Sequence, residues 1–150
     1  MASLTGSTIA STYDRLLSLP SGGGNTDNLV IVTDGDGTTT FAMQLSTTTL
    51  CIDNPTTSSA SQGGILRLQS DDGAVMASGH RLGVIEFGGA EDTSSTITVG
   101  ARIEALSDAT WSASENGADL VFYTTDGNAS QAENMRIYSD STSGIQIKNS

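Results

Sequence analysis

Apolar and polar residues alternate along several stretches of this chain, most clearly between residues 96 and 105. The apolar positions of that stretch are Ile97, Val99, Ala101, Ile103 and Ala105, and the polar positions between them include Thr98, Arg102 and Glu104. A period of two over this length predicts a β-strand with one apolar face and one solvated face. The chain is therefore expected to be built around strands.

The neighbouring stretches differ, because they place apolar groups on both faces. Val84, Ile85 and Phe87 lie within residues 82–90, and an unbroken apolar run at 120–123 lies within residues 118–127. Strands of this kind need cover on both sides, from a second sheet or a second chain. We expect several copies to supply that cover around an axis, since cyclic symmetry closes such an assembly.

Before residue 65, the pattern predicts a short helix followed by a small sheet. Ile9, Tyr13, Leu16 and Leu17 recur at helical spacing before Pro20, although such a short helix is marginal alone and a frayed arm is the alternative. Strands are expected at 28–33, 41–45 and 49–53, with a tight turn at 34–37. Residues 1–55 thus form an N-terminal region, 56–64 a linker, and 65–150 a second β-rich part that begins with a strand at 65–69 and ends with one at 145–147.

Composition narrows the classes of partner. Hydrophobic residues make up 36% and aromatic residues 5% of the 150 residues, which gives one chain a thin core. The net charge of −11 opposes nucleic-acid binding. The sequence has no membrane-spanning run, and its one cysteine, Cys51, excludes an internal disulfide and is expected to be a buried thiol.

Four blocks of the second part occur in an order that resembles a module of bacteriophage tail-fibre and related virion proteins. The blocks are Leu82-Gly-Val-Ile-Glu-Phe87, Ala101-Arg-Ile-Glu-Ala105, Leu120-Val-Phe-Tyr-Thr-Thr-Asp-Gly127 and Glu133-Asn-Met-Arg-Ile137. The last block reads Glu-Arg-Met-Arg-Ile in the family, so Asn134 departs from it. The resemblance covers residues 63–150 and implies a β-rich, trimeric virion protein without enzyme activity.

From the pattern and the resemblance together, we expect an all-β, antiparallel β-sandwich or fibre-like module in an intertwined homotrimer. The predicted function is a short tail-fibre-like appendage, assembled in the host cytoplasm and attached to the tail or capsid of the virion. The residues assigned to attachment or trimerisation are Ile9, Tyr13, Leu16 and Leu17. A capsid decoration or head-fibre protein is one alternative, and a tip that binds a host surface glycan is another.

Carboxylates and one histidine are the candidates for chemistry. Glu86 and Glu104, with Asp119, could serve as the paired acids of a polysaccharide depolymerase. Because polar members of alternating strands are more often solvated or paired with arginine, we expect Arg102 and Arg136 to pair with Glu86 and Glu104. His80 follows Gly79 in an expected exposed loop, without the partners of a zinc site or a catalytic triad.

Two further features have both a purely structural and a functional interpretation. Asp34-Gly-Asp-Gly37 begins like a calcium loop, but the later ligand positions do not fit and turn chemistry explains the glycines. Trp111 lies in the spacer 106–117 and is expected to pack rather than to stack on a sugar, although it remains the candidate receptor contact. We therefore expect no metal, no cofactor and no catalytic residue.

Overall fold

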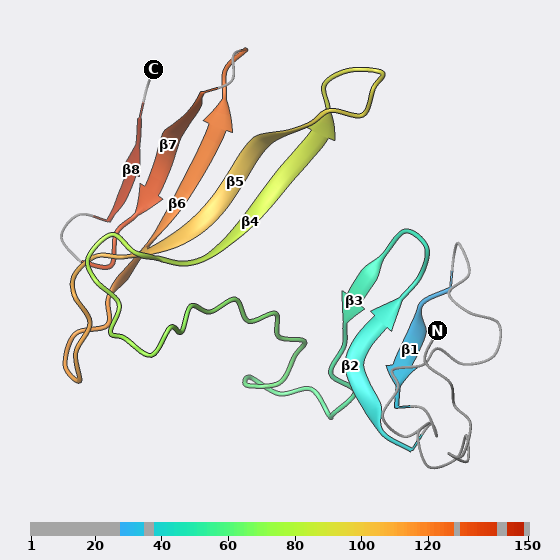
Figure 1. Ribbon diagram of the computed structural model, residues 1–150. Helices are drawn as coiled ribbons and strands as arrows, with labels where there is room; N and C mark the ends of the chain where they lie inside the picture. Colours follow the sequence, from blue (N-terminus) through green and yellow to red (C-terminus); the bar gives the residue numbers. More distant parts are fainter. Residues whose placement is uncertain (1–27, 35–37, 128–129, 141–143, 149–150) are drawn as a thin grey trace, which may run out of the picture. The chain divides into compact units, whose positions relative to one another are not determined.

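The computed structural model describes residues 28–34, 38–127, 130–140 and 144–148 (Figure 1). The predicted N-terminal helix, with Ile9, Tyr13, Leu16 and Leu17, lies outside these residues, and so does most of the turn predicted at 34–37. The chain divides into two compact units, Met1–Arg67 and Leu68–Ser150. The regular structure of the described residues is all-β and antiparallel, in two sheets.

The first sheet contains three short strands in the order of the sequence. They are β1 (Val30–Thr33), β2 (Thr40–Leu45) and β3 (Leu50–Ile52), and all three were predicted. Val32 is buried, whereas Phe41 and Leu50 are exposed. A three-stranded sheet of this size encloses almost no core. Cys51 is half-buried, so the prediction of a buried thiol is wrong; the thin sheet offers too little cover.

The segment that follows β3 folds back onto that strand. Asn54 Nδ2 donates to Gln62 Oε1 over 3.0 Å, and the amide of Gln62 donates to the carbonyl of Ser59. Gly64 runs so close to the Ile52 carbonyl that a Cβ atom at residue 64 would collide with it. The path of the chain beside β3 therefore requires glycine at residue 64.

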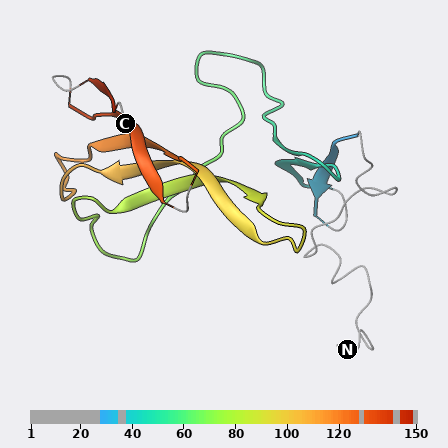
Figure 2. The same ribbon diagram turned by 90° about the horizontal axis from the view of Figure 1, so that it is seen from above.

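The second sheet is a five-stranded antiparallel meander. Its strands are β4 (Arg81–Ala90), β5 (Ile97–Ser107), β6 (Ala118–Thr125), β7 (Gln131–Ile137) and β8 (Ile145–Ile147). Figure 2 shows that the long strands β4 and β5 twist along their length. The strands predicted from the sequence at these places are confirmed. Each pairs with its neighbour in the sequence, as short hairpin connections require.

Residues 65–69 do not form the predicted strand. They run as irregular chain before β4, with Ile65, Leu66 and Leu68 exposed. A strand is defined by its ladder of hydrogen bonds, and no neighbouring strand pairs with this segment among the described residues. The apolar pattern of residues 65–69 is typical of a strand, but the described residues contain no strand that pairs with it.

β4 and β5 are long, so the loop between them is short and the loop after β5 is shorter than the spacer predicted at 106–117. β4 continues through Gly88 to Ala90, so the hairpin loop to β5 is only residues 91–96. β5 continues to Ser107, and the loop that follows contains an antiparallel bridge between Ser112 and Glu115 instead of a helical turn.

No helix in the described residues is long and apolar enough to cross a membrane.

A β-bulge interrupts the pairing of β6 with β7 at the residue where the sequence departs from the fibre-like pattern. Phe122 pairs with Met135 and Tyr123 pairs with Glu133, which leaves Asn134 as the extra residue. The side-chain amide of Asn134 donates to Thr124 Oγ1. The backbone carbonyl of Asn134 accepts from the backbone amide of Lys148 over 2.8 Å. The bulge therefore has its own polar partners and binds the end of β8.

Candidate functional site

The register of the second sheet separates its side chains into two unlike faces, because directly paired residues of antiparallel strands point to the same side. We call one the uncharged face; its residues are Gly83, Ile85, Phe87, Ala101, Ile103, Ala105, Leu120, Phe122, Thr124, Ala132, Met135, Ile137, Ile145 and Ile147. We call the other the charged face; its residues include Arg81, Val84, Glu86, Arg102, Glu104, Asp119, Val121, Tyr123, Glu133, Arg136 and Gln146.

The uncharged face is open in the chain described here. Ile85 is 45% exposed, Phe87 55% and Ile147 71%. Residues near the centre, such as Ile103 and Phe122, are half-buried. Single exposed apolar residues are ordinary on a protein surface, but a contiguous apolar patch of this kind marks a place where another molecule binds.

A small apolar hollow of about 120 Å³ lies on this face. Gly83, Ile85, Ile103, Ala105 and Leu120 line it, together with parts of Val84 and Glu104, and Leu68 closes one side. Leu68 lies so close that a Cβ atom on Gly83 would be 2.6 Å from the Leu68 Cβ. The small residues Gly83 and Ala105 thus create a depression between larger side chains.

The charged face is held by ion pairs that cross from strand to strand. Glu104 on β5 lies 2.8 Å from Arg81 on β4 and 3.2 Å from Arg102 on its own strand, measured from Glu104 Oε2 to the guanidinium nitrogens. The Glu104 side chain is almost fully buried. A buried carboxylate is costly unless it is paired in this way, so the two arginines are required by its position.

A second group of ion pairs joins β6, β7 and the end of β8. Arg136 on β7 donates to Asp119 Oδ2 over 2.8 Å and to Glu133 Oε2 over 2.6 Å. Lys148 Nζ lies 2.8 Å from the other oxygen of Glu133. Asp119 also accepts from the amide of Ser139 over 3.0 Å. These bonds connect the charged groups of three strands.

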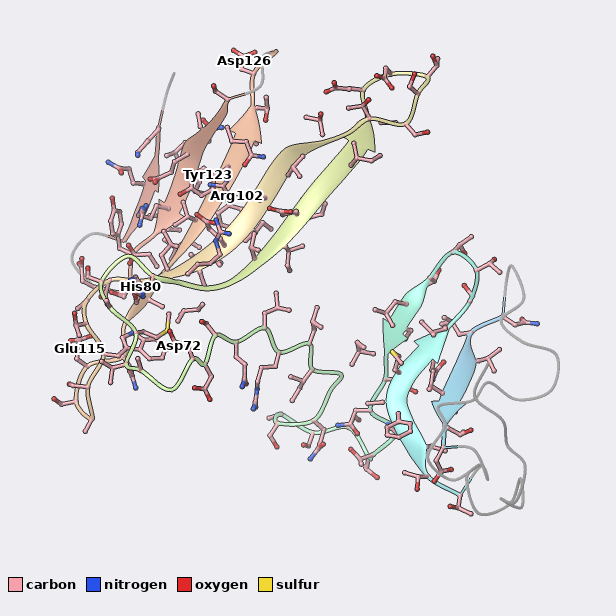
Figure 3. All side chains as sticks on the ribbon, viewed as in Figure 1. Asp72, His80, Arg102, Glu115, Tyr123 and Asp126 are labelled. Atoms are coloured by element: carbon pink, nitrogen blue, oxygen red, sulfur yellow. The ribbon has the colours of Figure 1, made fainter. Side chains whose placement is uncertain are left out.

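Arg102 also contacts an aromatic ring on the neighbouring strand β6. Its guanidinium carbon lies 4.0 Å from the centre of the Tyr123 ring on β6, and Figure 3 shows the two labelled side chains together on the sheet. Arg102 also donates to Gln131 Oε1 on β7. This cation–π contact is close enough to contribute to stability. Burial, together with hydrogen bonding to Glu104, raises the pKa of Tyr123 above its usual value.

Glu133 is the carboxylate most affected by this network. The hydrogen bonds from Arg136 outweigh partial burial and, with the contact from Lys148, lower the pKa of Glu133 to about 2. Conversely, the hydrogen bond to Glu133 raises the pKa of Arg136. Both groups are therefore ionised throughout the physiological pH range.

At several positions, burial differs from what the alternating pattern predicted. Glu104 was expected on a solvated face and is 3% exposed, and Val121 beside it is fully buried. The apolar positions Ile97 and Ile85 are exposed instead. Arginine and lysine stems cover neighbouring apolar groups when their heads are paired, so the charged face supplies its own cover. The uncharged face is less covered: Leu68 closes one side of its hollow, and Ile85 and Phe87 are exposed.

The predicted acids do not form one catalytic pair. Glu86 is exposed, Glu104 is held by Arg81 and Arg102, and Asp119 is held by Arg136. The expected pairing of arginine with strand carboxylates is correct for Arg102 and Glu104. The expected pairing of Arg136 with Glu86 or Glu104 is wrong, because the register sets Arg136 beside Asp119 and Glu133.

His80 and Trp111 lie at the end of the sheet where β4 begins. His80 is exposed, as predicted, and Figure 3 shows it near Glu115 and at the end opposite to Asp126. Trp111 is half-buried; its indole N–H donates to the Gly117 carbonyl over 3.0 Å, and its amide donates to the Met76 carbonyl. The tryptophan thus ties together the loop after β5.

Sequence reasoning missed the roles of Arg81, Tyr123, Glu133 and Lys148. Tyr123 and Glu133 lie in the fibre-like blocks, but the pattern assigns them no contact, and the register of the strands sets their partners across the sheet. Within the described residues, no group of three or more His, Cys, Asp or Glu side chains is arranged to hold a metal ion. The network is therefore made of paired charges, with cation–π contacts from Arg102 to Tyr123 and from Arg136 to Tyr138.

Compared with family models, with curated proteins and with solved structures, the chain matches none.

Proposed function

We propose that this chain is a structural protein of a bacteriophage virion, a short trimeric tail-fibre-like appendage attached through its N-terminal region. Support comes from the four sequence blocks that resemble the fibre module. They lie on β4, β5, β6 and β7, which are consecutive neighbours in one sheet. A module whose shared residues follow neighbouring strands is a coherent structural unit rather than a set of scattered matches.

The observation that carries the proposal is the open, uncharged face of the second sheet. A sheet with one exposed apolar face is incomplete as a monomer in water. Subunits of a fibre-like trimer complete such faces against each other, as a β-sandwich completes its core between two sheets.

The pairing of the strand carboxylates with arginine supports a role other than catalysis. Glu104 and Asp119 are occupied by arginines at 2.8 Å. A general acid of a glycosidase needs a raised pKa and a position beside the scissile bond. Carboxylates bound to arginine in the middle of a sheet are instead suited to holding strands together.

Two measurements test this proposal. Light scattering after size exclusion should give a molar mass near three times 15.4 kDa for the purified chain. Proteomics of purified phage particles from the genome that encodes it should detect its peptides at a stoichiometry typical of an appendage. Absence of the chain from the particles would overturn the virion assignment, and a stable monomer would overturn the trimeric appendage.

A further inference from the structure

We infer that the uncharged face of β4–β8 is the surface through which copies of this chain bind one another. The inference rests on the proposed self-assembling appendage and assigns its subunit contact to one side of one sheet. The occupant is a second copy of the same chain, presenting the same face.

Charge is the first reason to choose this occupant. The chain carries a net charge of −11, so copies repel each other wherever acidic surfaces approach. The uncharged face has no ionisable residue among its paired positions. Two copies can meet there without opposing like charges and without removing an unpaired charge from water. A strongly charged partner would gain nothing from this face.

Shape is the second reason. The hollow beside Gly83 and Ala105 is apolar and about 120 Å³ in volume. On the same face Phe87, Ile145 and Ile147 protrude and are more than half exposed. A face that carries both a depression and protruding apolar side chains can be complementary to itself, because protrusions of one copy can fill the depression of another.

Size is the third reason. Five strands about 4.8 Å apart, with lengths from three residues in β8 to eleven in β5, span a plane on the order of 500 Å². Protruding side chains add to that area, which approaches the roughly 600–800 Å² that each partner of a stable interface buries. The face is therefore large enough for self-association, whereas the small first sheet is not.

The test compares two exposed apolar residues, one on the face and one away from it. Ile85 lies on the uncharged face at 45% exposure, and Val75 lies in the irregular segment before β4 at 68% exposure. Ile85→Glu should weaken association at least about a hundredfold, since it buries an unpaired charge in the contact. Val75→Glu adds the same charge outside the contact and should leave the molar mass unchanged.

A second measurement avoids any loss of folding caused by the new charge. In a Cys51→Ser background, single cysteines placed by Ile85→Cys and Val75→Cys are reacted with a thiol reagent in the native assembly. The cysteine at position 85 should react at least about tenfold more slowly than the one at 75, although it would be nearly as exposed in a monomer. Dilution below the dissociation constant of the assembly should remove this protection of the cysteine at position 85.

The outcomes separate this inference from the proposed function. A trimeric wild-type chain with equal thiol rates at 85 and 75, or with unchanged mass for Ile85→Glu, overturns the inference and leaves the trimeric appendage intact. A dimer with protection at 85 supports the inference and overturns the trimer. A monomer at high concentration overturns both.

Discussion

Glu104 on β5 and Val121 on β6 are directly paired in the register of the second sheet, and both are buried. A carboxylate and a fully buried valine share the centre of the charged face. The arrangement is stable only because Arg81 and Arg102 neutralise the carboxylate where it lies. The charged face thus acts as the better packed side of the sheet.

Replacing the central carboxylate should therefore destabilise the sheet. Glu104→Gln keeps the shape of the side chain but leaves Arg81 and Arg102 without their shared anion. We expect a loss of roughly 2 kcal/mol in the free energy of unfolding, the scale of a charged hydrogen bond in a partly buried site. Urea denaturation measures it. Glu86→Gln, an exposed carboxylate of the same face, is the matched control; equal losses would contradict the central role of Glu104.

The contact between Arg102 and Tyr123 should depend on the ring and not on the hydroxyl group. Tyr123→Phe keeps an aromatic face 4.0 Å from the guanidinium, whereas Tyr123→Leu removes it. The leucine variant should lose about 1 kcal/mol more stability than the phenylalanine variant. Thermal unfolding of the two variants side by side gives the difference. If phenylalanine is as harmful as leucine, the hydroxyl group rather than the ring carries the contact.

The positions of strands were accessible from the sequence, but the roles of their faces were not. Alternation at 97–105 located β5, and the apolar runs within 82–90 and 118–127 located its neighbours. Alternation cannot show which face is buried when the polar residues pair with each other. Glu104 and Arg81 are 23 positions apart in the chain, and only the register joins them.

The failed strand at 65–69 has a different cause. Its local pattern is that of a strand, but strand formation also depends on a partner that local sequence does not specify. Residue 134 is a different case: Asn134 departs from the fibre-like pattern, and it is the extra residue of the bulge between β6 and β7. Departures from an expected motif can therefore mark irregular backbone.

Acid should weaken the fold through Glu133. Its pKa in the folded protein is about 2, below the ordinary 4.5, so its contribution is complete above pH 4.5 and is lost as the pH falls towards 2. Because solvent screens these ion pairs, that contribution is on the order of 1 kcal/mol at neutral pH. Urea midpoints between pH 6 and pH 2 should decline steeply in this window. Glu133→Gln should be less stable at neutral pH and flatter below pH 4.5; a parallel decline in both proteins would show that other carboxylates dominate.

The close approach of Leu68 to β4 makes the strongest demand on a single residue. A Cβ atom at Gly83 would lie 2.6 Å from the Leu68 Cβ, so Gly83→Ala must displace the segment that carries Leu68. Gly89, on the same strand, has open space where its Cβ atom would be. We expect Gly83→Ala to lose about 1–3 kcal/mol through overpacking, while Gly89→Ala is neutral or slightly stabilising because it restricts the unfolded chain. Thermal unfolding measures both. An equal melting temperature for Gly83→Ala and wild type would mean that Leu68 leaves β4 at little cost, and that the hollow on the uncharged face is open on that side.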